Sequence, residues 1–207
     1  MQLSSFLPPR RTWDRVAAEL YYRRHPDQPW LPRQAIKLLA GLLKPTDRCF
    51  EWGSGGSTTW LSTRVHSVCS IEHDRAWYDR IQVQLKGAGT NGTHVQLLSL
   101  EPHEKPQAAP YVRAIDEFGD GQLDVCFIDG EHRAWCALAV PPKLVSGGLL
   151  IVDDAQQYVD HPTSSPHSRH GKGPPDEQWR QFAALVDRWR LVWVSDGYSD
   201  TAIWIKP

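Results

Sequence analysis

The chain has 207 residues, the length of one ordinary domain, and its 23 Lys and Arg side chains almost balance its 24 Asp and Glu. A hydrophobic fraction of 41% excludes a largely disordered chain. The near-neutral charge gives no basis for a nucleic-acid partner or an anionic membrane partner. Apolar runs are too short to cross a bilayer, and no secretory pattern is visible at the start. The four cysteines lack CxxC spacing, so we expect buried thiols in a cytoplasmic protein.

Helix and strand patterns follow one another in a regular order along the chain. Two helices are expected first, over 13–24 and 32–43, as part of an N-terminal helical cap over 1–44. Short β-branched apolar runs then alternate with helical patterns. The expected strands are 49–52, 67–72, 95–98, 123–129, 149–153, 191–194 and 202–205. The expected helices between them are 58–64, 76–85, 132–144 and 177–189.

This alternation predicts how the strands pair. Strands separated by helices favour right-handed crossovers and a parallel sheet with helices on both faces. Only the turn 195–200 separates the last two strands, which is too short for a crossover, so they should pair antiparallel. We therefore predict a single α/β domain over 1–207. Its centre would be a doubly wound, seven-stranded, mostly parallel sheet with an antiparallel last strand.

The segment 155–176 interrupts the alternation. It contains four prolines among Ser, Gly and His residues and has no periodicity. Long irregular loops in compact domains are usually binding-site lids or disordered segments. Because this loop leaves the fifth strand at its carboxyl end, where open α/β sheets bind ligands, we expect it near the active site.

A glycine-rich loop follows the first strand, with the sequence Gly53-Ser54-Gly55-Gly56-Ser57. A strand, a glycine loop and a helix at the start of a doubly wound sheet are typical of a nucleotide-type site. No Gly-Lys-Ser/Thr follows, which excludes a P-loop, and Thr58 replaces the third glycine of the dinucleotide fingerprint. Glu51 and Glu72 lie at the carboxyl ends of the first two strands. A carboxylate at the second position can accept both hydroxyls of a ribose.

Four motifs in order resemble those of class I S-adenosylmethionine-dependent methyltransferases, in the small O-methyltransferase branch. They are EWGSGGS at 51–57, SIEHD at 70–74, FIDGEH at 127–132 and SGGLLIVDD at 146–154. The resemblance covers residue 31 to the C-terminus and implies a Rossmann-like methyltransferase fold with S-adenosylmethionine as cofactor. It implies that Glu51 holds the methionine ammonium, Glu72 binds the ribose hydroxyls and His73 lies beside the adenine. The full set of cofactor-binding residues expected in this way is Glu51, Gly53, Ser54, Gly55, Ser57, Glu72, His73 and Asp129.

Acidic residues also end the fourth and fifth strands, at Asp129, Asp153 and Asp154. Adjacent strands lie about 4.8 Å apart, so these carboxylates can converge on one cation, and three oxygen ligands suit Mg²⁺ or Mn²⁺. Catechol-type O-methyltransferases, which this region resembles, bind a metal with acids at these two strand ends. Equally, Asp129 can cap the next helix and Asp153-Asp154 can start a turn. The metal site is therefore an open alternative.

His132 stands where metal-dependent relatives have a catalytic lysine. An unperturbed histidine pKa of about 6.5 suits a general base at neutral pH. A hydroxyl acceptor needs its proton withdrawn by a base or a metal ion, whereas methyl transfer otherwise depends on alignment. We therefore expect Asp129, His132 and Asp153 to be catalytic residues.

The expected function is methyl transfer from S-adenosylmethionine to a hydroxyl of a small molecule or a glycan. Two alternatives remain from the sequence. One is an NAD-dependent oxidoreductase, against which the position of Thr58 counts. The other is a methyltransferase-like module that binds the cofactor without transfer activity. The sequence does not indicate an oligomeric state.

Overall fold

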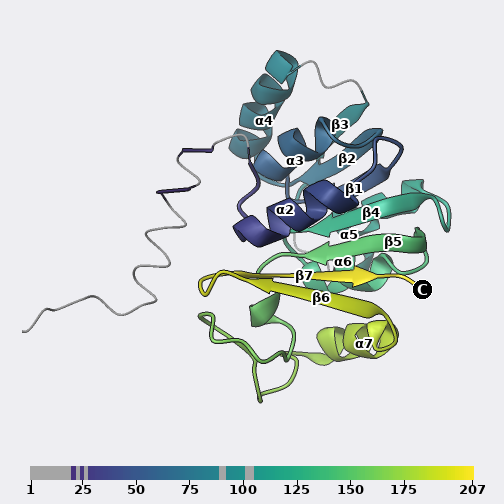
Figure 1. Cartoon of the computed structure of the whole chain (residues 1–207). Helices are drawn as coiled ribbons and strands as arrows, with labels where there is room; N and C mark the ends of the chain where they lie inside the picture. Colours follow the sequence, from purple (N-terminus) through teal and green to yellow (C-terminus); the bar gives the residue numbers. More distant parts are fainter. Residues whose placement is uncertain (1–19, 22–23, 26–27, 89–91, 101–104) are drawn as a thin grey trace, which may run out of the picture.

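The computed structural model describes residues 20–21, 24–25, 28–88, 92–100 and 105–207. Its centre is a seven-stranded sheet in the order β3-β2-β1-β4-β5-β7-β6 (Figure 1). β1 to β5 pair parallel, and β7 lies antiparallel between β5 and β6. This confirms the predicted doubly wound sheet with its antiparallel pair. The strands are β1 (Arg48–Trp52), β2 (Ser67–Glu72), β3 (Thr93–Leu97), β4 (Leu123–Ile128), β5 (Leu144–Val152), β6 (Arg190–Ser195) and β7 (Asp200–Ile205).

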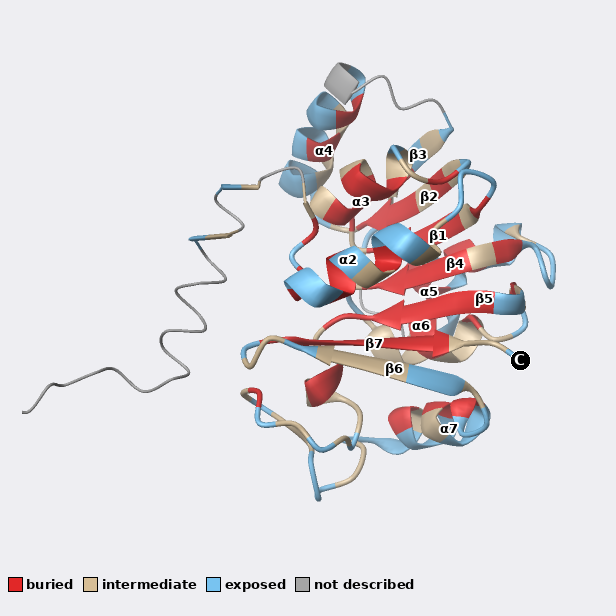
Figure 2. Cartoon of the chain, in the orientation of Figure 1, coloured by how far each residue is buried: buried red, intermediate tan, exposed pale blue. Residues whose placement is uncertain are grey.

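Helices cover both faces of the sheet; the inner strands such as β1, β4 and β7 are largely buried, whereas the edge strands β3 and β6 are mostly half-buried or exposed (Figure 2). Strand residues alternate between two core clusters, for example Cys49 toward one face and Phe50 toward the other. Because both faces are covered, the central strands are apolar on both sides. One face carries α2 (Arg33–Leu42), α3 (Gly56–Ser62) and α4 (Arg75–Ala88); the other carries α5 (Pro110–Arg113), α6 (Arg133–Ala139) and α7 (Glu177–Val186).

The predicted helix 132–144 is too long. α6 ends at Ala139, and Leu144 is already the first residue of β5. Pro141 and Pro142 explain the difference, because proline lacks the backbone N–H that would continue the helix. α5, only four residues long, was not predicted, since so short a helix shows no periodicity.

The predicted N-terminal cap is described only in part. α2 lies on the sheet with Ala35, Ile36 and Leu39 buried, in agreement with the helix expected at 32–43. The helix expected at 13–24 falls almost entirely outside the described residues. Among the described helices, none has the length and apolar character needed to span a bilayer.

The strand order reverses between β1 and β4, and this position determines where a ligand can bind. β1 pairs with β2 on one side and with β4 on the other. Past the strand ends the backbone stays in register, since the Asp129 N–H donates to the Trp52 carbonyl (2.9 Å) and the Asp153 N–H to the Ile128 carbonyl (3.1 Å). The loops after β1, β4 and β5 therefore lie next to one another at the switch point, where open α/β sheets bind ligands.

Candidate active site

The glycine loop after β1 lies directly against the loop after β4. Gly53 has a φ of +90°, which side chains rarely adopt, and a Cβ on it would stand 2.7 Å from the Gly130 nitrogen. A Cβ on Gly130 would overlap the Tyr111 hydroxyl. Glycine is therefore required at both positions, and this part of the site is bare backbone.

Glu51 lies beneath the loop and is fully buried. Its Oε1 accepts a hydrogen bond from Ser57 (2.5 Å), and its Oε2 accepts from Thr58 (2.5 Å) and Ser70 (2.7 Å). Burial raises the pKa of Glu51 to about 7, and the three hydroxyl donors oppose that rise. Glu51 thus ties β1 to β2 and α3. The structure places it outside the open crevice, so the expected contact with a methionine ammonium stays a prediction.

Glu72 ends β2 and organises the turn that follows. Its Oε1 accepts from the backbone N–H groups of His73 (2.7 Å) and Asp74 (2.8 Å), and its Oε2 accepts from the N–H of Ser54 (3.0 Å). The His73 Nδ1 lies 3.2 Å from Oε1. Because a carboxylate oxygen can accept two hydrogen bonds, Oε2 keeps one acceptor position unused among the described residues. Glu72 is therefore both a support for the glycine loop and an acceptor at the crevice.

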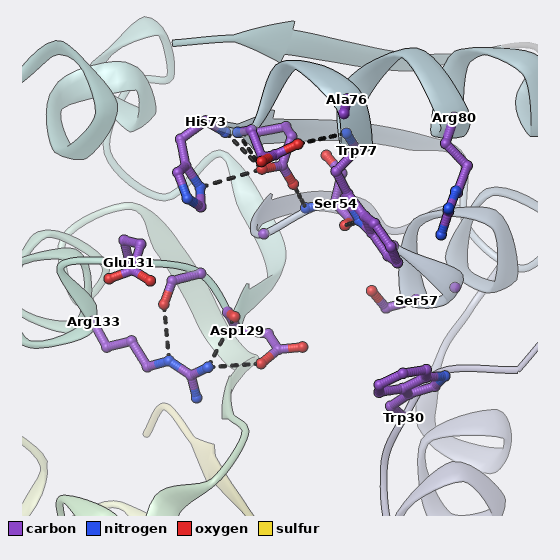
Figure 3. A pocket seen from close by; sticks show the side chains of 16 residues that line it. Trp30, Ser54, Ser57, His73, Ala76, Trp77, Arg80, Asp129, Glu131 and Arg133 are labelled. Atoms are coloured by element: carbon purple, nitrogen blue, oxygen red, sulfur yellow. Dashed lines mark hydrogen bonds and ion pairs between the residues drawn. The ribbon is translucent and has the colours of Figure 1, made fainter. Parts of the chain in front are cut away.

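A cavity of about 550 Å³ opens over the glycine loop and has the size of a small-molecule site (Figure 3). Asp129, His73 and Glu131 lie on one side of it, and Trp30, Trp77 and Arg80 on the other. The indole N–H of Trp77 donates to the Ser54 carbonyl. The predicted cofactor residues that line this cavity are Gly53, Ser54, Gly55, Ser57, Glu72, His73 and Asp129, whereas Glu51 does not.

A second cavity, of about 450 Å³, adjoins the first, and Trp30 and Asp129 line both. Asp153 and Asp154 line the second, from the end of β5. The loop 155–176 contributes to the same wall, and the turn between β6 and β7 closes the far side. The remaining lining residues are Gln156, Gln157, Pro166, His167, Tyr198 and Ser199.

The loop 155–176 is anchored to the sheet. Ser165 donates to the buried Asp200 on β7 (2.5 Å), and the His161 ring stacks on Trp193 at 4.1 Å. A short 3₁₀ turn over Ala155–Gln157 begins the segment. Within the loop itself, Asp160 accepts hydrogen bonds from the backbone N–H groups of Gly171 (2.9 Å) and Gly173 (3.2 Å). These contacts hold Gln156 and His167 at the second cavity.

The three acids at the strand ends have different surroundings. One-third of the Asp129 side chain is exposed, and partial burial together with the charges of Asp154 and Glu72 raises its pKa to about 6. Asp153 is buried and accepts from the Thr201 hydroxyl (2.9 Å), and burial raises its pKa well above the ordinary range. Asp154 has a φ of +52°, and its Oδ1 accepts from Gln156 (3.2 Å) and Ser199 (3.0 Å).

His132 lies apart from these acids. It precedes α6 in the left-handed region, with a φ of +50°, and its ring meets the Tyr111 ring edge-on at 6.4 Å. It is not among the residues that line either cavity. The structure therefore does not bring His132 together with Asp129 and Asp153, and its role as a base stays a prediction.

The acids do not form a metal site. In the part of the chain that the structure describes, no three His, Cys, Asp or Glu side chains are grouped to hold a metal ion. The Arg133 guanidinium is bonded to Asp129 instead, at 2.9 Å. A cation beside a carboxylate disfavours a second cation there. These residues do not fit the Mg²⁺ or Mn²⁺ site that the sequence left open.

Several contributors to the site were missed in the sequence, and Arg133 and Trp30 are the two on which the arrangement depends most. Arg133 stands four residues after Asp129, but α6 begins only at Arg133, so the helical spacing rule gave no signal for this pair. Trp30 follows Pro29, and the segment 28–29 packs on the start of α3, where the Gln28 carbonyl would stand 2.7 Å from a Cβ on Gly56. Trp30 itself is 70% exposed at the junction of the two cavities. Only the fold brings this segment to the glycine loop.

Comparisons with known proteins agree with the fold. No family model matches the chain, and no curated protein is significantly similar to it. A methyltransferase-like protein from Silicibacter pomeroyi has 20% identity and a TM-score of 0.59, covering 87% of this chain and 90% of its own. A methyltransferase from Geobacter sulfurreducens has 16% identity and a TM-score of 0.57, covering 99% and 93%.

A third structure adds a ligand to this comparison. It is a protein from Streptococcus mutans that is described as a methyltransferase and was solved in complex with SAH. Its sequence identity to this chain is 10%, and the TM-score is 0.57. It covers 83% of this chain and 94% of its own. At these low sequence identities, the structural similarity shows a shared fold and nothing more specific. This chain has the Rossmann-like fold of the class I methyltransferases.

Proposed function

We propose that this protein transfers a methyl group from S-adenosylmethionine to a hydroxyl of a small-molecule or glycan acceptor. The observation that supports this most is the pair of cavities that meet at Asp129 and Trp30. Methyl transfer is a direct displacement, so it needs a donor site and an acceptor site that open onto one another. The two cavities supply that arrangement.

The first cavity suits the cofactor. Glu72 offers its unused acceptor position to the ribose hydroxyls, and the bare backbone at Gly53 and Gly55 permits close approach. His73, next to Glu72, is placed for the adenine end. In this proposal the methionine end and its sulfonium lie near Asp129 and Trp30, the two residues that line both cavities.

The walls of the second cavity favour a neutral, hydroxyl-rich acceptor. Its described lining holds carboxyl groups, amides, an imidazole and two hydroxyls but neither Lys nor Arg, so it offers no permanent cation to an anionic acceptor. Two aromatic side chains, Trp30 and Tyr198, are exposed at 70% and 37%. Aromatic faces beside hydrogen-bonding carboxylates and amides suit a sugar ring or a similar polyol.

Asp154 is the proton acceptor in this proposal. Its Oδ1 is held by Gln156 and Ser199, while Oδ2 has no hydrogen-bond partner among the described residues. The backbone at Asp154 is in the left-handed region, which is uncommon outside glycine and concentrates at functional sites. As the acceptor oxygen bonds to the methyl carbon, the carbon–sulfur bond breaks, S-adenosylhomocysteine leaves and the hydroxyl proton passes to Asp154.

Titration calorimetry with S-adenosylhomocysteine and with NAD tests the cofactor. We expect binding of S-adenosylhomocysteine and none of NAD; the reverse would favour the oxidoreductase alternative. Transfer of a labelled methyl group to a panel of sugars, phenols and amines tests the acceptor. Binding of the cofactor without transfer to any compound in the panel would favour the module without activity.

A further inference from the structure

The Arg133 side chain makes four hydrogen bonds within the described part of the chain. It leaves the first position of α6 and runs between the ends of β4 and β5. Its Nε donates to the Gly130 carbonyl (2.9 Å), and one terminal nitrogen donates to the Asp153 carbonyl (2.6 Å). The other terminal nitrogen donates to the Asp129 carbonyl and to Asp129 Oδ1, both at 2.9 Å. One planar group thus connects both strand ends.

The acidic side chains around Arg133 are the same ones that the sequence suggested as possible metal ligands. Asp129, Asp153 and Asp154 all lie close enough to stabilise its positive charge. The side chain is 15% exposed, so solvent screens these interactions only in part. Tyr158 adds a ring 5.7 Å from the guanidinium carbon. The other arginine that lines the first cavity, Arg80, stacks on Trp77 across the cavity from Asp129 (Figure 3).

We propose that Arg133 is an internal cation that takes the place of a divalent metal at the ends of β4 and β5. Its guanidinium fixes the separation of the two strand ends and orients the Asp129 carboxylate at the junction of the two cavities. A guanidinium is suited to this because its planar donors reach several acceptors at once and it stays charged at all physiological pH values. The catalytic part of the inference rests on the proposed function: methyl transfer then needs no added Mg²⁺ or Mn²⁺.

Metal binding tests the inference without any activity. Mn²⁺ binding to the full chain is measured by electron paramagnetic resonance in the wild type, Arg133→Ala and Arg113→Met. Arg113, the last residue of α5, forms an exposed ion pair with Asp116 and serves as the control for loss of an arginine charge. We expect the wild type and Arg113→Met to bind no Mn²⁺ at micromolar concentrations, and Arg133→Ala to bind it at least tenfold more tightly than the wild type. Micromolar binding by the wild type that Asp154→Asn abolishes would overturn the inference.

Chemical rescue distinguishes a cation from a merely structural side chain. Once an acceptor is known, we expect chelator to change wild-type kcat by less than twofold, and Arg133→Ala to lower it at least a hundredfold. Arg133→Lys should recover part of that loss, and added methylguanidinium should raise kcat of Arg133→Ala in a saturable way. If Mn²⁺ restores Arg133→Ala fully and methylguanidinium does nothing, Arg133 is not the working cation. Should Arg133→Ala not fold, Arg133→Lys and the wild-type chelator assay still decide.

The inference and the proposed function fail separately. If no acceptor is ever methylated, the Mn²⁺ measurements on the wild type and Arg133→Ala stand unchanged. If the wild type binds Mn²⁺ tightly and also transfers methyl groups, the proposed function survives and the role of Arg133 does not.

Discussion

Gly53 and Gly130 lie so close that a methyl group on Gly53 would stand 2.7 Å from the Gly130 nitrogen. Gly53 belongs to the loop after β1. Gly130, 77 positions later in the sequence, belongs to the loop after β4. Their contact brings the two loops at the switch point together without any intervening side chain. Both glycines line the first cavity, whose shape depends on that spacing.

Gly53→Ala is expected to separate these loops. The positive φ alone costs about 1–3 kcal/mol for a non-glycine residue, and the clash with Gly130 adds to it. We expect a lower unfolding midpoint and loss of S-adenosylhomocysteine binding by calorimetry. Gly147→Ala is the control, because Gly147 also has a positive φ of +79° but has open space around it. If both variants bind the cofactor equally well, the close approach is not needed.

Glu72→Gln should weaken cofactor binding. The amide keeps the shape of the side chain but replaces one acceptor oxygen by a donor that faces backbone N–H groups. Charge-assisted hydrogen bonds contribute about 1.5–3 kcal/mol, so we expect the dissociation constant of S-adenosylhomocysteine to rise tenfold or more. Asp79→Asn, in an exposed pair with Arg75, is the matched control. An unchanged dissociation constant would remove Glu72 from the site.

The buried Glu51 should make stability fall as pH rises. Its pKa is about 7 in the folded chain against an ordinary 4.5, so between these values the unfolded chain loses the proton first. Fewer protons on the unfolded state means that the free energy of unfolding decreases with pH, by about 1.4 kcal/mol per pH unit from this group. Below pH 4.5 both states keep the proton, and above pH 7 both lose it, so the effect is confined to that window.

Denaturant titrations at pH 5 and pH 7 measure this slope in the wild type and in Glu51→Gln. The amide cannot ionise, and its single oxygen can still accept from one of the two hydroxyls, Ser57 or Ser70, while the other hydroxyl has to turn and accept from the amide NH2. We expect the variant to gain stability relative to the wild type by about 2–3 kcal/mol between the two pH values. If the free energy of unfolding changed with pH by the same amount in both proteins, Glu51 would be ionised throughout this pH range.

Much of the fold follows from local sequence patterns, because the alternation of β-branched runs and amphipathic helices is a local property. The glycine loop could be located in the same way, since Gly53 needs a backbone that only glycine adopts readily. The extent of α6 could also have been predicted more closely, because Pro141 and Pro142 were visible in the sequence. Residue types and local geometry were sufficient in these cases.

The arrangement of the site could not be read in this way. Whether Glu51 faces a ligand or three hydroxyls depends on how α3 and β2 pack around β1. The bond from Arg133 to the Asp153 carbonyl joins residues 20 positions apart, on different elements. Trp30 reaches the cavities only because the chain before α2 crosses the start of α3. Such contacts are set by tertiary packing.

The choice between Asp154 and His132 as the proton acceptor is open to a direct test. Asp154 lines the second cavity, whereas His132 lines neither cavity. A lost general base costs about 10²–10⁴ in rate, so we expect Asp154→Asn to lower kcat within that range and to leave S-adenosylhomocysteine binding unchanged. Ser199→Ala should lower kcat by a smaller factor, since it removes one of the two donors that orient Asp154. His132→Ala should change kcat little, and a hundredfold loss there with an active Asp154→Asn would assign the proton to His132 instead.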